Sequence, residues 1–328
     1  MKIRTTSAVK KERLQNLLND KSVVSAMAID QRGSLAKMLG AALGHDASKE
    51  EVEAFKKVCV EVLTPYASAV LLDSEYGMPA LAAKASSTGV LLAYEKTGYD
   101  ATVKGRLPDL LDGYSAAKLR EEGADAVKLL VYYDPFDTDE VNTIKKDFIR
   151  AVGDECAIEE MPYFMEIVSY SDTVGDAKSI EFAKAKPGIV KAYMEEFSKA
   201  EYNIDVLKVE MPFNALFVEG IGAGPEFAYT RDEAMELTRD AASVCDIPFI
   251  YLSAGVTIDQ FLSSLDLVAE AGVEYSGVLC GRATWQNSVM AYGEGGEEGL
   301  RTWLLDEGVR NIKAVNERLE KGASGLEL

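Results

Sequence analysis

Histidine is almost absent from this 328-residue chain: His45 is the only one. A catalytic zinc centre that needs two or three histidines therefore cannot form within one chain. A Ser-His-Asp triad would have to use His45, and nothing in its flanking sequence supports that role. We interpret the glycine- and alanine-rich residues 39–46 around it as a surface loop. Acid–base chemistry must then depend on carboxylates, lysines or tyrosines.

Cysteine is scarce as well, and the cysteines are far apart, with no C-x-x-C pair. They are Cys59, Cys156, Cys245 and Cys280. This spacing favours free thiols in a reducing compartment over a disulfide framework. The first residues are charged and polar, unlike a signal peptide, and the apolar runs elsewhere are too short to span a membrane. We expect a cytoplasmic protein without a membrane partner.

Positive charge is in the minority: 35 lysines and arginines stand against 54 aspartates and glutamates, a net charge of −19. Nucleic acids and anionic membranes bind basic surfaces, so we expect neither as a partner. The acidic residues 294–298, broken by glycines, are typical of a solvated loop and the start of a helix. We expect one domain over residues 1–328, with a helical extension over about 1–22 and a C-terminal helix and tail over about 309–328.

Eight short apolar runs alternate with amphipathic segments of helical periodicity. The runs cover residues 25–30, 69–73, 89–95, 126–132, 163–169, 206–210, 249–253 and 277–281. Near-continuous apolar strands that alternate with helices indicate a parallel sheet buried on both faces. Eight such units favour an α/β fold, a single closed (β/α)8 TIM barrel, over an open doubly wound sheet. No G-x-G-x-x-G follows the first run, which further weakens a dinucleotide-binding fold.

Charged side chains interrupt three consecutive runs, at Lys128, Glu166 and Lys208. Because strand side chains alternate between two faces, all three can point into one cavity. A buried lysine is costly unless its charge is paired or its pKa falls, and a neutral amine attacks carbonyl carbon. Two such lysines predict a Schiff-base site in which one cation lowers the pKa of the other. The alternative interpretation is a structural ion pair inside the barrel.

Glycine follows the last two runs, in Ser253-Ala254-Gly255 and in Gly281-Arg282. The loops after strands seven and eight of such barrels commonly hold a phosphate. Glycine lets backbone N–H groups approach the phosphate, and Arg282 can add a bidentate clamp. A Ser-Ala-Gly sequence by itself is typical of an ordinary turn, but its position here favours a phosphate site.

Several long words of the sequence closely resemble the bacterial tagatose 1,6-bisphosphate aldolases, a family of class I, Schiff-base enzymes. The words are IDQRG (29–33), LAYEKTGYD (92–100), DVLKVE (205–210), YLSAGV (251–256) and GVLCGRATW (277–285). The loops at 211–214 and 219–227 depart from the family pattern. Enzymes of this family cleave tagatose 1,6-bisphosphate to dihydroxyacetone phosphate and glyceraldehyde 3-phosphate without a metal or another cofactor.

The resemblance also implies roles for individual residues. Lys208 corresponds to the Schiff-base lysine and Glu166 to the general acid/base. The residues implied to contact substrate are Asp30, Gln31, Lys128, Ser253, Leu279 and Arg282. Arg32 is our candidate for the second phosphate, and the family implies a homo-oligomer.

Two alternatives remain open at this point. The same chemistry can act on a related ketose phosphate, such as a fructose bisphosphate epimer or a sulfofructose phosphate. The other alternative is a protein of another class, a regulator that binds sugar phosphates without turnover. Such a protein would need the binding pocket but no acid/base. The combination of Lys208, Glu166 and Lys128 argues against the regulator, because binding by itself does not require an acid/base.

Overall fold

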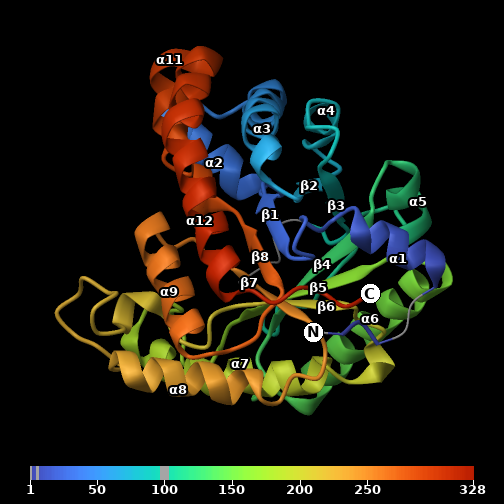
Figure 1. Ribbon diagram of the computed structural model, residues 1–328, viewed down its shortest axis with the longest axis vertical. Coiled ribbons are helices and arrows are strands. Elements are labelled where there is room, and N and C mark those ends of the chain that lie inside the picture. Colours follow the sequence, from blue (N-terminus) through green and yellow to red (C-terminus); the bar gives the residue numbers. More distant parts are fainter. Residues whose placement is uncertain (1, 5–6, 97–102) are drawn as a thin grey trace.

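Eight parallel β-strands close into a barrel in the computed structural model, which describes residues 2–4, 7–96 and 103–328 (Figure 1). The strands stand in chain order, and β8 pairs with β1 to close the barrel. They are β1 (Val24–Ala28), β2 (Ala69–Asp73), β3 (Gly89–Ala93), β4 (Ala126–Tyr133), β5 (Tyr163–Ser169), β6 (Val206–Val209), β7 (Phe249–Leu252) and β8 (Gly277–Cys280). The predicted (β/α)8 TIM barrel is confirmed. Residues 97–100 of the family words lie outside the described residues.

Helices surround the barrel (Figure 1). They are α1 (Ala8–Gln15), α2 (Gly33–Leu43), α3 (Lys49–Leu63), α4 (Met78–Leu81), α5 (Ala116–Glu121), α6 (Asp139–Ile158), α7 (Ile180–Phe197), α8 (Arg231–Ala242), α9 (Ile258–Glu270), α10 (Arg282–Trp285), α11 (Ser288–Trp303) and α12 (Val309–Gly322). Short 3-10 turns are η1 (Thr64–Tyr66), η2 (Ala200–Tyr202) and η3 (Ala215–Phe217), and η4 (Leu304–Gly308) is π-helical. None of the helices in the described ranges has the length and apolar character that a bilayer crossing requires.

Local sequence signals explain where several helices begin. Helices α3, α8 and α9 start at capping boxes, in which a Ser or Thr side chain and a Glu or Gln three residues later satisfy backbone N–H groups at the helix start. The pairs are Ser48 with Glu51, Thr230 with Glu233 and Thr257 with Gln260. The helices pack their apolar faces on the outer wall of the barrel and form the larger core.

The inside of the barrel is apolar toward the amino ends of its strands. The inward residues there include Val24, Ala26, Leu71, Leu91, Ala126, Phe164, Val206, Ile250 and Leu279. Residues from both ends of the chain pack against this cluster, among them Ile3, Leu14 and Leu326. The backbone N–H of Ile3 also donates to the carbonyl of Glu327 at 3.1 Å, and Figure 1 places the N and C labels near each other. We call this seal the floor of the barrel.

Two expectations about local structure were wrong. Most of residues 39–46 belongs to α2 rather than to a loop, because Leu35 and Leu39 bury one face of that helix. The helix ends at Gly44, whose φ of 77° is the left-handed conformation of a helix C-cap, and His45 follows in an exposed turn. Residues 294–298 are exposed as expected but lie within α11, with a non-helical kink at Gly296. The four cysteines are free and buried, as predicted.

Candidate active site

Three charged side chains from adjacent strands meet inside the barrel above its apolar interior. Lys128 comes from β4, Glu166 from β5 and Lys208 from β6. Glu166 Oε2 lies 2.8 Å from Lys128 Nζ and 2.8 Å from Lys208 Nζ. All three side chains are buried, since they share the inward face that alternation along each strand assigns to them.

Lys128 is surrounded by carboxylates. Its Nζ donates to Asp30 Oδ2 at 2.8 Å and to Glu95 Oε1 at 2.7 Å, in addition to the contact with Glu166. Burial by itself would lower the pKa of this fully buried ammonium, but the three carboxylates hold that pKa well above its ordinary value. Lys128 is therefore a permanent cation in the centre of the cluster.

Asp30 follows β1 and joins the cluster from the far side. Burial would raise the pKa of its carboxyl, but the positive charges of Lys128 and Lys208 hold it well below the usual range. Gln31 Nε2 lies 3.3 Å from Asp30 Oδ1, and a Cβ built on Gly281 would be 3.4 Å from the same Nε2. The loops after β1 and β8 therefore approach each other beside the lysines.

The two ammonium contacts of Glu166 Oε2 do not have the angles of hydrogen bonds. This buried oxygen has no hydrogen-bond partner within the described part of the chain, although it touches two ammonium groups. A carboxylate oxygen held between two lysine nitrogens can accept a proton from either of them or from a hydroxyl placed beside it. Glu166 is thus arranged for acid–base work between two amines.

Glu95 was absent from the predicted site, yet it closes the cluster at the end of β3. Its Oε1 accepts from Lys128, and its Oε2 accepts from the backbone N–H of Leu130 at 3.0 Å. Burial raises the pKa of Glu95 despite these cations. Arg32, our candidate for a phosphate, is itself buried, with Nη1 3.0 Å from Glu75 Oε2 and Nη2 3.5 Å from Glu95 Oε1. Strand alternation through residues 91, 93 and 95 was the signal that points to Glu95.

The loops after β7 and β8 also converge. Residues 253–256 form a tight turn closed by the bond from Val256 N–H to the Ser253 carbonyl at 3.1 Å, with positive φ at Ala254 (49°) and Gly255 (73°). A Cβ on Gly255 would stand 2.7 Å from Arg282 Nη2, so the guanidinium lies directly against this glycine. Within the described ranges, no carboxylate pairs with Arg282. The pair of loops therefore presents backbone and a cation suited to an anion.

Two other residues on the inward faces lie apart from the cluster. Leu279 belongs to the apolar interior of the barrel and is 1% exposed. Glu210, which alternation places on the face of Lys208, turns instead toward α7. Its Oε1 lies 3.1 Å from Lys186 Nζ, and its Oε2 accepts from the backbone N–H of Ser169 at 2.6 Å. Glu210 thus ties the ends of β5 and β6 to α7.

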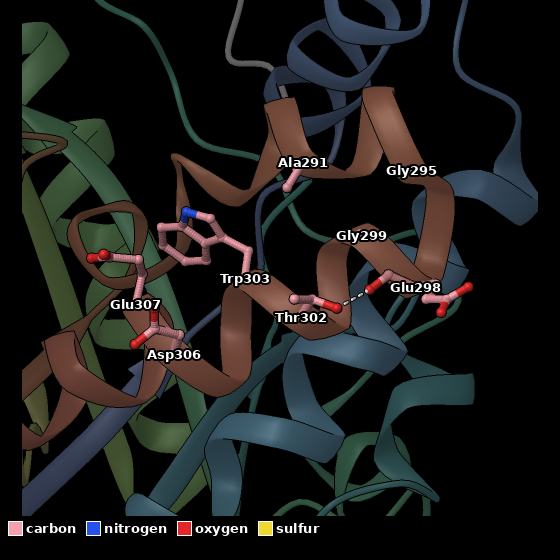
Figure 2. A pocket seen from close by; sticks show the side chains of 8 residues that line it. All are labelled: Ala291, Gly295, Glu298, Gly299, Thr302, Trp303, Asp306 and Glu307. Atoms are coloured by element: carbon pink, nitrogen blue, oxygen red, sulfur yellow. Dashed lines mark hydrogen bonds between the residues drawn. The ribbon is translucent and has the colours of Figure 1, made fainter.

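A separate groove of about 550 Å³ runs along α11 and the π-helical turn, away from the strand ends (Figure 2). It is lined by Ala291, Gly295, Glu298, Gly299, Thr302, Trp303, Asp306 and Glu307. Figure 2 shows the carboxylates of Asp306 and Glu307 on the same side as the indole of Trp303. These linings are anionic, and both carboxylates pair with Arg310, so the groove is unsuited to a phosphate.

Comparisons with known proteins agree with this geometry. The chain matches the family described as DeoC/LacD family aldolase over residues 24–287, and it belongs to that family of aldolases, which are lyases. A tagatose 1,6-diphosphate aldolase of Listeria monocytogenes is 50% identical over 94% of this chain and 91% of its own length. Tagatose 1,6-diphosphate aldolase 2 of Enterococcus faecalis is 49% identical over 98% of this chain and 96% of its own.

A solved structure shares the fold at much lower identity. It is a fructose-bisphosphate aldolase from Plasmodium falciparum in a ternary complex with TRAP and a small-molecule inhibitor. The two chains superpose with a TM-score of 0.73 at 15% identity, each covered to 98%. At that identity the likeness concerns the barrel alone.

Proposed function

We propose that this protein is a class I, metal-independent aldolase that reversibly cleaves tagatose 1,6-bisphosphate to dihydroxyacetone phosphate and glyceraldehyde 3-phosphate. The observation that carries the proposal is the position of the Lys208 amine, 2.8 Å from Glu166 Oε2 and beside the permanent cation of Lys128. The names of the relatives at about half identity support the choice of substrate.

In the first half of the proposed reaction, the neutral amine of Lys208 attacks C2 of the open-chain ketose. Loss of water gives a protonated imine, which accepts an electron pair far more readily than a ketone does. Lys128 lies beside the reacting amine, and both nitrogens contact Glu166 Oε2. After attack, the substrate hydroxyls form hydrogen bonds with Lys128, Asp30 and Gln31.

In the second half, the Glu166 carboxylate accepts the C4 hydroxyl proton while the C3–C4 bond breaks. The bonding electrons move into the imine and form an enamine, and glyceraldehyde 3-phosphate leaves. Protonation of the enamine at C3 and hydrolysis of the imine release dihydroxyacetone phosphate and restore Lys208. Leu279 contacts the carbon chain from the apolar side.

The phosphate on C1 binds between the loops after β7 and β8 in this scheme. The phosphate contacts the backbone of Ser253, Gly255 and Gly281, and the positive charge comes from Arg282. We further propose that the enzyme works in the cytoplasm as a homo-oligomer. The four free thiols support the first point and the resemblance to the family supports the second, which light scattering of the purified protein measures.

The decisive experiment traps the imine. The protein is incubated with tagatose 1,6-bisphosphate, reduced with borohydride, and mapped by peptide mass spectrometry, while release of glyceraldehyde 3-phosphate is followed in parallel. We expect a reduced adduct on Lys208 that the Lys208→Ala variant does not form. Lys56→Met, which removes a buried lysine outside the cluster, serves as the matched control.

The alternatives give other outcomes in the same experiment. Adduct and turnover with a higher kcat/KM for a fructose bisphosphate or a sulfofructose phosphate would keep the chemistry and replace the substrate. Binding of sugar phosphates without adduct or turnover in folded protein would refute the aldolase and support the regulator.

A further inference from the structure

An arginine outside the cluster stacks between two tyrosines beyond the ends of β4 and β5. The Arg106 Cζ lies 5.2 Å from the ring centroid of Tyr132 and 4.8 Å from that of Tyr170. The two rings meet edge to face, with centroids 6.4 Å apart. Tyr170 is fixed in turn, because its hydroxyl accepts from Lys145 Nζ at 2.9 Å and lies 2.7 Å from Asp137 Oδ2. The guanidinium therefore has a rigid aromatic support.

The position of Tyr132 relates this stack to the reacting centre. Tyr132 lies on the face of β4 that carries Lys128, and it pairs in register with Val168, two residues beyond Glu166. Two strand residues correspond to about 7 Å along the strand. Tyr132 therefore stands about one inward layer above the lysine cluster, and the charges of Glu166 and Lys128 both influence its hydroxyl.

The stack lies across the barrel from the first phosphate site. In a closed ring of eight strands, β4 stands opposite β8, and Arg282 follows β8. A ketose bound through C2 directs C1 toward one wall and C3 to C6 toward the other. The end of the sugar that faces away from Arg282 therefore points toward the wall that carries Tyr132 and Arg106.

Arg106 is also available to bind an anion, unlike Arg32. No ion pair joins Arg106 to a carboxylate within the described part of the chain, and its buried Nε has no hydrogen-bond partner there. Two acids beside this stack are engaged: Asp137 with Tyr170, and Asp172 with the backbone N–H of Gly105 at 3.2 Å. A guanidinium that contacts aromatic rings can still donate two N–H bonds to a phosphate.

We propose that Arg106 binds the second phosphate of the substrate, at the end of the ketose away from Arg282, and that it sets the preference for bisphosphates over monophosphates. This inference rests on the proposed aldolase activity. It replaces Arg32, whose guanidinium is held by Glu75 and Glu95.

The test compares tagatose 1,6-bisphosphate with tagatose 1-phosphate in Arg106→Ala, Arg106→Lys and wild-type protein. Loss of a charged hydrogen-bonding partner should lower the ratio of kcat/KM, bisphosphate over monophosphate, roughly 10- to 150-fold in Arg106→Ala. Arg106→Lys keeps the charge without the planar fork and should fall in between. Lys104→Ala, an exposed cation on the same loop, is the control for general electrostatic attraction and should leave the ratio within about twofold.

A second readout separates this inference from the function on which it rests. Dihydroxyacetone phosphate carries only the first phosphate, so Arg106→Ala should still form its borohydride-reducible adduct on Lys208. An unchanged ratio, or equal losses on both sugars, would overturn the role of Arg106 while the aldolase stands. A wild-type protein that forms no adduct with either compound would overturn both.

Discussion

Two regions of the molecule each bury a lysine completely, but the two lysines differ in how many carboxylates surround them. Between α3 and the barrel wall, Lys56 has the single carboxylate of Asp73. Burial outweighs that one partner, so the pKa of Lys56 is lowered. At the strand ends, Lys128 has three carboxylates, and its pKa is raised well above the ordinary value. The number of partners, rather than the depth of burial, decides the direction in which the pKa of these two lysines moves.

The two lysine environments also differ in whether a substrate can take part in them. The Lys56 pair is self-contained, and Asp73 in addition accepts from the backbone N–H groups of Glu75 and Tyr76. The Lys128 cluster instead shares Glu166 with a second amine, which leaves a group whose partner can be exchanged for substrate. We therefore expect substitutions in the first region to change stability alone and those in the second to change catalysis as well as stability.

The largest expected effect comes from Lys208→Ala. Removing the nucleophile should lower kcat at least about 10⁴-fold, because no other amine in the cluster has the same access to the carbonyl carbon. Steady-state turnover of the bisphosphate and circular dichroism of the variant test this together. Lys56→Met is the comparison, and a similar loss of kcat in folded Lys56→Met would contradict the division between the two regions.

A matched change from carboxylate to amide sharpens the comparison further. Glu166→Gln should lower kcat by roughly 10²–10⁴ while imine formation remains detectable, since a general acid/base contributes on that scale. Asp73→Asn makes the same chemical change beside Lys56 and should leave kcat nearly unaltered. Borohydride trapping measures imine formation, and stopped-flow turnover measures the reaction through bond cleavage. Loss of trapping in Glu166→Gln would show that Glu166 is needed before bond cleavage.

Much of this comparison could be anticipated from sequence alone. The strand runs are long and apolar enough to be found, and alternation along them places Lys128, Glu166 and Lys208 on inward faces. Alternation extends to Glu95 too, but only the fold shows that its carboxylate reaches Lys128. Arg106 gives no such signal, because it lies in an irregular loop with a φ of 43° and meets Tyr132 only through tertiary packing.

The helix over residues 33–43 was missed for a related reason. The glycines lower the helix preference of this segment, although its alanines, leucines, lysine and methionine favour a helix, and burial of Leu35 and Leu39 against the core settles it as α2. Helix propensity depends on the residues of the segment itself, whereas burial depends on the rest of the fold and cannot be judged from the segment.

A smaller effect on stability is expected when each buried ammonium is removed. Breaking a buried ion pair costs about 3–5 kcal/mol because the remaining charge has no partner. Lys128→Met removes the ammonium that Asp30, Glu95 and Glu166 share, so it should lower the urea midpoint more than Lys56→Met does. The double variant Lys56→Met/Asp73→Asn removes both charges of its pair and should recover most of the loss. Equal midpoints for the two single variants would refute the argument from partner number.

The smallest effect concerns a third buried lysine. Burial lowers the pKa of Lys145 to about 8, although the charges of Asp137, Asp134 and Asp172 oppose the change. Between about pH 8 and pH 10 the unfolded chain still holds a proton that the folded protein has released, so stability rises with pH by up to about 1.4 kcal/mol per unit from this group.

Urea midpoints of wild-type protein and Lys145→Met, measured across that range, isolate the contribution of Lys145. The wild-type midpoint should rise relative to the variant above about pH 8 and run parallel to it below. Parallel curves throughout would mean that Lys145 keeps its proton in the folded state.

The floor of the barrel has a consequence for protein synthesis. It joins Ile3 to Glu327, and barrel closure joins β1 to β8, so both wait for nearly the whole chain to leave the ribosome. Ser253 and Arg282 follow Lys208 in the chain, so a nascent chain carries Lys208 before it has the loops after β7 and β8. The reactive amine therefore gains its catalytic surroundings only in the finished molecule.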